Sequence, residues 1–188
     1  MTSEFEPVPS FVIDEMLPDE IDAATSMRKQ SWIDTYTNPS LGITSEWIEE
    51  RFAGQLSGDN RENRTERFLK NKQSGKFNAW AAHDDAGNII GSTTPFIEKD
   101  GRQRVGSIYV DKKWHGKGVG SQLMQKVIGW CDPAKPIYLE VVTYNDRAKA
   151  FYQKWNFEEI PNSEALYDNK LPEITMIRQP QNTQGETK

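Results

Sequence analysis

The sequence is poor in the residues on which most covalent and metal-based sites depend. It has one cysteine, Cys131, and two histidines, His83 and His115, among 188 residues. A single cysteine excludes an internal disulfide and a cysteine-based metal cluster. The two histidines lie far apart in the sequence, which disfavours a histidine-rich metal site. We therefore expect no bound metal, and we expect Cys131, in an apolar helical stripe, to pack in the core.

Excess positive charge and long apolar runs are also lacking. The 23 lysines and arginines are outnumbered by 28 aspartates and glutamates, which gives a formal net charge of −5. An acidic chain is a poor candidate for binding nucleic acid, because phosphate contacts need a basic face. No apolar run approaches the roughly 20 residues needed to span a bilayer, and the first residues lack the apolar core of a signal peptide. We expect a cytoplasmic protein that binds neither nucleic acid nor membrane.

What is present fits one folded domain of ordinary size. Aromatic residues make up 11% of the chain and charged residues 27%, as in globular proteins and unlike disordered ones. We find no internal repeat and no second domain. The sequence predicts an N-terminal tail over residues 1–10, one domain over 11–178, and a flexible polar tail over 179–188.

Hydrophobic periodicity predicts an α/β (α+β) fold. Strands are expected over residues 11–17, 76–84, 89–98, 102–110, 136–142, 157–160 and 172–178. Helices are expected over residues 18–36, 44–52, 65–72, 119–131 and 145–155. The nearly continuous apolar run at 136–142 predicts a central strand covered on both faces. This order predicts one mixed, mostly antiparallel sheet with helices on both faces.

A glycine-rich stretch precedes the helix at 119–131. Gly116, Gly118 and Gly120 stand within five residues. The first N–H groups of a helix have no partners inside it, and glycines let a phosphate come close to them. The stretch therefore predicts a phosphate or pyrophosphate site. Its spacing fits neither the P-loop nor the dinucleotide-binding fingerprint, and on its own a glycine-rich turn without function stays open.

A second motif makes the first more specific. It places residues at the spacing N-x-x-A-x-x-F-Y-x-x-x-x-F, namely Asn145, Ala148, Phe151, Tyr152 and Phe157. Together with "GSIYVDKKWHGKGVGSQLM" (106–124), it resembles the GNAT superfamily of N-acetyltransferases over about residues 77–160. Two positions depart from the family pattern. Asn156 replaces a glycine, which an asparagine can do because it tolerates left-handed conformations.

The second departure is His115, which stands where the family has glutamine or arginine. Its unperturbed pKa is about 6.5, and one ring N–H can still bind a phosphate. We expect cofactor binding to survive with some pH dependence. A plain exposed loop residue is the alternative interpretation.

The resemblance implies a GNAT-like domain whose fourth and fifth strands splay apart, and an enzyme that uses acetyl-CoA as cosubstrate. It implies transfer of the acetyl group to a primary amine of a small molecule or a peptide N-terminus, by direct attack. The implied cofactor-binding residues are Ile108, Tyr109 and Val110 for the pantetheine arm, and His115, Gly116, Lys117, Gly118, Val119, Gly120 and Ser121 for the pyrophosphate. Asn145 is implied to contact the pantetheine arm, and it also suits a helix N-cap.

The resemblance also implies the catalytic residues. Tyr152 matches the general acid that protonates the coenzyme A sulfur, which also makes it a cofactor-binding residue. A backbone N–H near Val110 would stabilise the oxyanion. Glu140 matches the base proposed for ribosomal-protein N-terminal acetyltransferases of this superfamily, acting through water. The alternatives are an aromatic packing role for Tyr152 and a purely electrostatic role for Glu140.

Several alternatives stay open at this stage. Trp32, Tyr36, Trp47 and Trp80 could line the acceptor cleft or belong to the core. A non-catalytic acetyl-CoA-binding sensor or interaction module is the alternative function, and a hydride-transferring nucleotide enzyme is the weaker third one. The sequence names neither the acceptor amine nor the oligomeric state, although family members are often homodimers.

Overall fold

The computed structural model describes residues 10–180, which contain eight strands and five α-helices. The strands are β1 (Phe11–Glu15), β2 (Trp80–Asp84), β3 (Ile89–Ile97), β4 (Gln103–Val110), β5 (Ile137–Val142), β6 (Phe157–Glu159), β7 (Ala165–Tyr167) and β8 (Leu171–Arg178). The helices are α1 (Ile21–Tyr36), α2 (Ser45–Leu56), α3 (Arg61–Gln73), α4 (Val119–Trp130) and α5 (Asp146–Gln153). The expected tails, 1–10 and 179–188, lie almost entirely outside the described residues. None of the described helices is long and apolar enough to cross a membrane.

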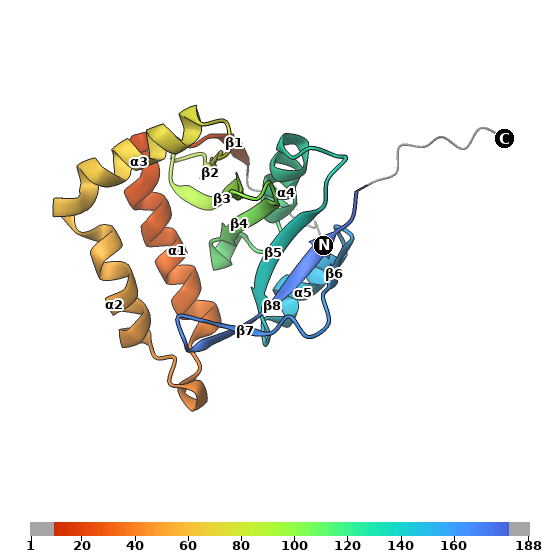
Figure 1. The fold of residues 1–188 in the computed structure, drawn as a ribbon. Coiled ribbons are helices and arrows are strands. Elements are labelled where there is room, and N and C mark those ends of the chain that lie inside the picture. Colours follow the sequence, from red (N-terminus) through yellow and green to blue (C-terminus); the bar gives the residue numbers. More distant parts are fainter. Residues whose placement is uncertain (1–9, 181–188) are drawn as a thin grey trace, which may run out of the picture.

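All the strands belong to one sheet (Figure 1). Its order is β1–β2–β3–β4–β5–β8–β6, and β7 pairs with β8. Neighbouring strands run antiparallel except β4 and β5, which run parallel. The predicted mixed, mostly antiparallel sheet is confirmed.

Helices cover both faces of this sheet, as predicted. Along β5, Leu139 and Val141 pack in a core cluster with Met124 of α4. Val142 packs on the opposite face in a cluster with Trp32 of α1. Because side chains alternate between the two faces of a strand, these contacts put α4 and α1 on opposite sides of the sheet.

Two segments differ from the sequence-based expectation. We expected a loop and a short helix between residues 54 and 76, but α2 continues to Leu56 and α3 begins at Arg61. The helix expected over 65–72 is part of α3, whose polar sequence concealed its first turn; α3 buries Arg64 and Phe68 on its inner face. The three-residue strand β7 was not predicted, because all of its residues are exposed and give no burial pattern.

The parallel strands β4 and β5 separate soon after they begin. They pair only through Gln103 with Ile137 and through Arg104 with Tyr138. The expected splay is therefore confirmed. Both faces of β5 are covered, as expected, except at Glu140, which is exposed beside the gap.

Helix α4 packs behind both halves of the sheet. Val119 and Leu123 contact the cluster that includes Trp80 of β2, whereas Met124 and Val127 belong to the cluster of β5 and β8. Cys131, directly after this helix, is buried in the second cluster, and burial raises the pKa of its thiol to about 11. Such a thiol is protonated at neutral pH, which supports the packing role predicted for it.

Candidate active site

The splay leaves one edge of β4 without a neighbouring strand. The Asp111 N–H donates to the Ile90 carbonyl oxygen (2.8 Å), and Val110 is paired with Gly91. Because inward and outward backbone groups alternate along an antiparallel ladder, the N–H and C=O of Ile108 and Val110 point away from β3, toward the gap. The backbone groups of Tyr109 point toward β3. Two of the three residues predicted to pair with an extended ligand therefore offer backbone groups to the gap.

A cavity of about 590 Å³ follows this open edge, and we call it the β4–β5 cavity. It is lined by most of the predicted site residues: Ile108, Tyr109, Val110, His115, Gly116, Gly118, Gly120, Ser121, Glu140, Asn145 and Tyr152. The other two predicted residues, Lys117 and Val119, do not line it. Val119 is fully buried in the core, and the Lys117 ammonium lies 5.0 Å from the centre of the Trp114 ring.

The glycine loop forms one end of the β4–β5 cavity. Gly116 and Gly118 have φ angles of 77° and 89°, in the left-handed region that side chains disfavour. Gly120 differs, because a Cβ there would make only ordinary contacts, the nearest at 3.7 Å. The first two glycines are thus required by the backbone conformation. Asn156 has a φ of 62°, which agrees with the prediction that an asparagine can replace a glycine there.

His115 lies between the glycine loop and the start of α5. Its Nε2 is 3.0 Å from the Val110 carbonyl oxygen, and its Nδ1 contacts the Arg147 guanidinium. The neutral tautomer protonated at Nε2 satisfies both contacts. Burial, and then the Arg147 cation, lower the pKa of His115 below its ordinary value. In this tautomer the only ring N–H is already used by Val110.

Arg147 supplies the positive charge that His115 lacks. It lines the β4–β5 cavity beside the glycine loop, and sequence reasoning missed it. Its position in the first turn of α5, two residues after the Asn145 cap, was the available signal. A guanidinium beside free helix N–H groups is well suited to an anionic phosphate.

Asn145 and Tyr152 lie at opposite ends of α5. The Asn145 Oδ1 accepts a hydrogen bond from the Ala148 N–H (3.2 Å), which confirms the N-cap. The Tyr152 ring packs edge-on against Phe151 and Phe157, with ring centres 5.4 Å and 5.9 Å apart. Burial raises the pKa of Tyr152, and the neighbouring Tyr109 raises it further. The phenol therefore stays protonated at neutral pH and can act as a proton donor.

A second cavity of about 370 Å³ lies on the other side of β4, against α1 and α2; we call it the α1–α2 cavity. The two cavities share five lining residues, Tyr36, Gly106, Ser107, Tyr109 and Glu140. Opposite Gly106 the β3–β4 register shifts: Ile108 pairs with Thr93, but Val105 pairs with Pro95. This adds one residue to β4 and makes a β-bulge. The cavities therefore meet at a bulged strand, with Glu140 at the junction.

Glu140 is not an isolated carboxylate. It forms an ion pair with Arg104 of β4, and its side chain is 37% exposed. Glu140 and Arg104 thus span the gap between the splayed strands. This arrangement explains how a carboxylate is tolerated in an apolar strand.

The α1–α2 cavity is walled by aromatic side chains. Trp32 and Tyr36 line it, and the Trp32 Nε1 donates to the Tyr109 hydroxyl (2.7 Å). Of the four aromatic residues whose role was open, these two therefore face a cavity. Trp47 packs at the edge of the core cluster that contains Trp32. Trp80, in β2, is buried in the cluster between the sheet and α4.

Sequence reasoning found Glu140 but missed the other three charged residues of the α1–α2 cavity, which are Arg28, Arg51 and Glu173. Burial raises the pKa of Glu173, and the Arg104 and Arg51 cations oppose that rise. Glu173 could have been found by the signal that marked Glu140, because it too interrupts an apolar strand. The two arginines gave no such signal, since arginines on a helix usually face solvent.

Comparisons with known proteins agree with this geometry. A family model described as the acetyltransferase (GNAT) family matches residues 41–157. Protein ElaA of Escherichia coli (strain K12) is 33% identical over 78 residues, which are 40% of this chain and 48% of that protein. The chain thus spans about half the length of the curated relatives that it matches.

Solved structures are similar over nearly the whole chain. PaiA N-acetyltransferase from Thermoplasma acidophilum, in complex with coenzyme A, gives a TM-score of 0.70 at 17% identity, over 90% of this chain and 99% of that one. A GNAT-family acetyltransferase from Streptococcus pneumoniae gives 0.67 at 20% identity, over 90% and 98%. These likenesses concern the fold. Since the family model itself spans more than half of the chain and includes both the glycine loop and the whole of α5, this chain belongs to the GNAT acetyltransferase family.

Proposed function

We propose that this protein transfers the acetyl group of acetyl-CoA to a primary amine of a small molecule or a peptide N-terminus. The observation that carries the proposal is the meeting of two cavities at Glu140 and the bulge of β4. One cavity offers an open strand edge and a glycine loop, and the other offers an aromatic pocket with carboxylates. Two substrates that enter from opposite sides of the sheet would meet there.

The β4–β5 cavity suits coenzyme A by its donor groups. The outward N–H and C=O of Ile108 can pair with an amide of an extended pantetheine arm, as an added strand pairs with an edge. The glycine loop, the N-terminus of α4 and Arg147 suit the pyrophosphate. The Val110 carbonyl accepts from His115, so the contribution of Val110 rests on its N–H. Acetyl-CoA would supply an acetyl group activated as a thioester.

The residues around the junction can then do three things that amine acetylation requires. Glu140, alone or through water, would take a proton from the acceptor ammonium, because only a neutral amine attacks. The Val110 N–H would stabilise negative charge on the carbonyl oxygen. Tyr152, kept protonated by burial, would donate a proton to the departing sulfur. The acidic net charge is compatible with a cytoplasmic enzyme.

The test is release of free thiol from acetyl-CoA with a panel of primary amines, followed by mass detection of the acetylated amine. Acceptor-dependent thiol release with stoichiometric product is the expected result. Tight binding of acetyl-CoA without such release for any amine would favour the non-catalytic sensor.

A further inference from the structure

We propose that the acceptor amine carries a carboxylate, and that Arg28 binds this carboxylate in the α1–α2 cavity. The inference rests on the proposed function, which has the acceptor enter through this cavity. It adds the chemical class of the acceptor.

Arg28 is a poorly compensated cation. Burial lowers the pKa of its guanidinium, which means that the surroundings disfavour the charge. Its one hydrogen bond to a side chain is to the neutral Gln55 amide (2.5 Å), and its guanidinium stacks 5.2 Å from the centre of the Phe52 ring. Its Nε is buried without a hydrogen-bond partner, as is the Nε of Arg64, but unlike Arg64 it belongs to no ion pair among the described residues. A partly buried cation without a counter-charge is costly, so its presence points to an anionic ligand.

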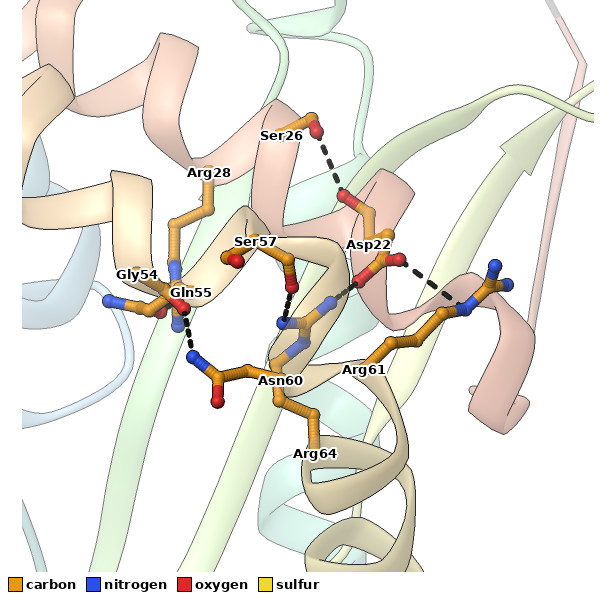
Figure 2. Close-up of polar contacts among 9 residues, drawn as sticks. All are labelled: Asp22, Ser26, Arg28, Gly54, Gln55, Ser57, Asn60, Arg61 and Arg64. Carbon is orange, nitrogen blue, oxygen red and sulfur yellow. Dashed lines mark hydrogen bonds and ion pairs between the residues drawn. The ribbon is translucent and has the colours of Figure 1, made fainter.

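Neighbouring arginines are compensated from within the protein. Figure 2 shows the Arg64 guanidinium held between the Asp22 carboxylate (2.6 Å) and the Ser57 carbonyl (2.8 Å), whereas Arg28 extends from α1 toward Gln55 only. Arg51, which shares the α1–α2 cavity with Arg28, forms an ion pair with Asp168 and contacts the Tyr167 hydroxyl. The lack of a carboxylate partner thus distinguishes Arg28 from both.

The cavity also holds one carboxylate without a close cation. In the β5–β8 register Glu173 is opposite Val142 and Glu140 is opposite Thr175, so both carboxylates lie on the face toward α1. Glu140 is paired with Arg104, but no ion pair among residues 10–180 includes Glu173. The uncompensated charges of the cavity are therefore one positive, on α1, and one negative, on β8.

A ligand with one charge of each sign matches this inventory. Its carboxylate would accept paired hydrogen bonds from Arg28, whose planar fork suits a carboxylate. Its ammonium would lie toward Glu173 and Glu140, at the junction with the β4–β5 cavity, before it loses a proton. A diamine would instead place its second cation beside Arg28, which is unfavourable. A simple amine would leave Arg28 without a counter-ion.

The experiment uses matched acceptors and matched variants. Glycine, β-alanine, L-methionine and L-phenylalanine are each compared with their amides, and 1,4-diaminobutane represents the diamines. Thiol release gives kcat/KM, and tryptophan fluorescence of the coenzyme A-saturated protein gives Kd without turnover. The variants are Arg28→Gln and Arg28→Lys. Arg61→Gln, whose side chain is 61% exposed at the surface, is the control. Thermal unfolding checks that each variant is folded.

We expect at least one acid to bind and react about 10-fold or more better than its amide, as charge-assisted hydrogen bonds predict. Arg28→Gln should remove this preference through KM, Arg28→Lys should keep part of it, and Arg61→Gln should keep all of it. No preference for any acid, a preference for the diamine, or a preference that survives Arg28→Gln would overturn the inference. If acids bind through Arg28 but no amine releases thiol, the site assignment stands and the proposed function fails.

Discussion

Substitution of Tyr152 by phenylalanine removes the proton-donating hydroxyl and keeps the ring, so it separates the catalytic role of Tyr152 from its packing role. The ring fills a site between Phe151 and Phe157 and is 8% exposed. Phenylalanine keeps this ring, and none of the hydrogen bonds found among residues 10–180 uses the Tyr152 hydroxyl. The change should therefore alter the free energy of unfolding by less than about 1 kcal/mol. Alanine is unsuitable, because loss of a buried aromatic ring costs about 3–5 kcal/mol.

The expected kinetic effect is much larger than the effect on stability. A positioned general acid contributes about 10²- to 10⁴-fold to the rate, which corresponds to about 3–5 kcal/mol of barrier. Tyr152→Phe should lose this factor in kcat, while the Kd for coenzyme A changes little. Because burial raises the pKa of Tyr152, the wild-type profile should show no ionisation of this group between about pH 6 and 9.

Steady-state thiol release and calorimetric titration with coenzyme A measure the two effects. Tyr138→Phe is the matched control, because Tyr138 is on β5 but lines neither of the two cavities described. If Tyr152→Phe keeps kcat within about threefold of the wild type, a proton-donor contribution of the usual size is excluded. Tyr152 would then be a packing residue.

Three further predictions concern the same site. Arg147→Ala should raise the pKa of His115, because it removes the cation beside the imidazole; NMR titration of the ring measures this, and an unchanged pKa would contradict it. The same change should weaken coenzyme A binding about 10-fold, because it removes a cation from the phosphate site. As the folded-state pKa of His115 is depressed, its stabilising contribution is present above about pH 6.5 and is lost as pH falls through the folded pKa. Gly118→Ala should destabilise the protein by about 1–2 kcal/mol, because φ is 89° there, although an added Cβ would meet no atom. Gly129→Ala, within α4, should stabilise the protein by about 0.5–1 kcal/mol. Equal melting temperatures of the two variants would refute the role of backbone conformation. Glu140→Gln should lower turnover across about pH 6–9, and unchanged turnover in that range would remove Glu140 from the mechanism.

The sequence predicted the β4–β5 cavity well, because its residues are close together in local motifs. Gly116, Gly118, Asn145 and Tyr152 mark a loop and one short helix, and their conformations follow from local rules for turns and caps. The splay of the strands and the roles of these residues came from the family resemblance. Periodicity alone indicated only a mixed sheet.

The α1–α2 cavity was beyond sequence reasoning for a physical reason. Arg28 and Arg51 are on two helices, and Glu173 reaches the cavity only because β8 returns to pair with β5. Such long-range pairing leaves no local pattern. The pairing of His115 with Arg147 across 32 residues was hidden in the same way.

The two-residue contact between β4 and β5 also has a consequence for how the molecule opens. The cluster beneath β5 and β8 reaches β4 only through Val105 and Ile108, and α4 contacts this cluster and the cluster beneath β2 and β3 through successive turns. Because the strand pairing at this seam is short, we expect the two halves to separate there more readily than within either half, and α4 to limit the separation. A ligand lying along the seam would also hold the two halves of the sheet together. Its binding should slow amide hydrogen exchange in β4 and β5 together, well beyond the residues that it touches.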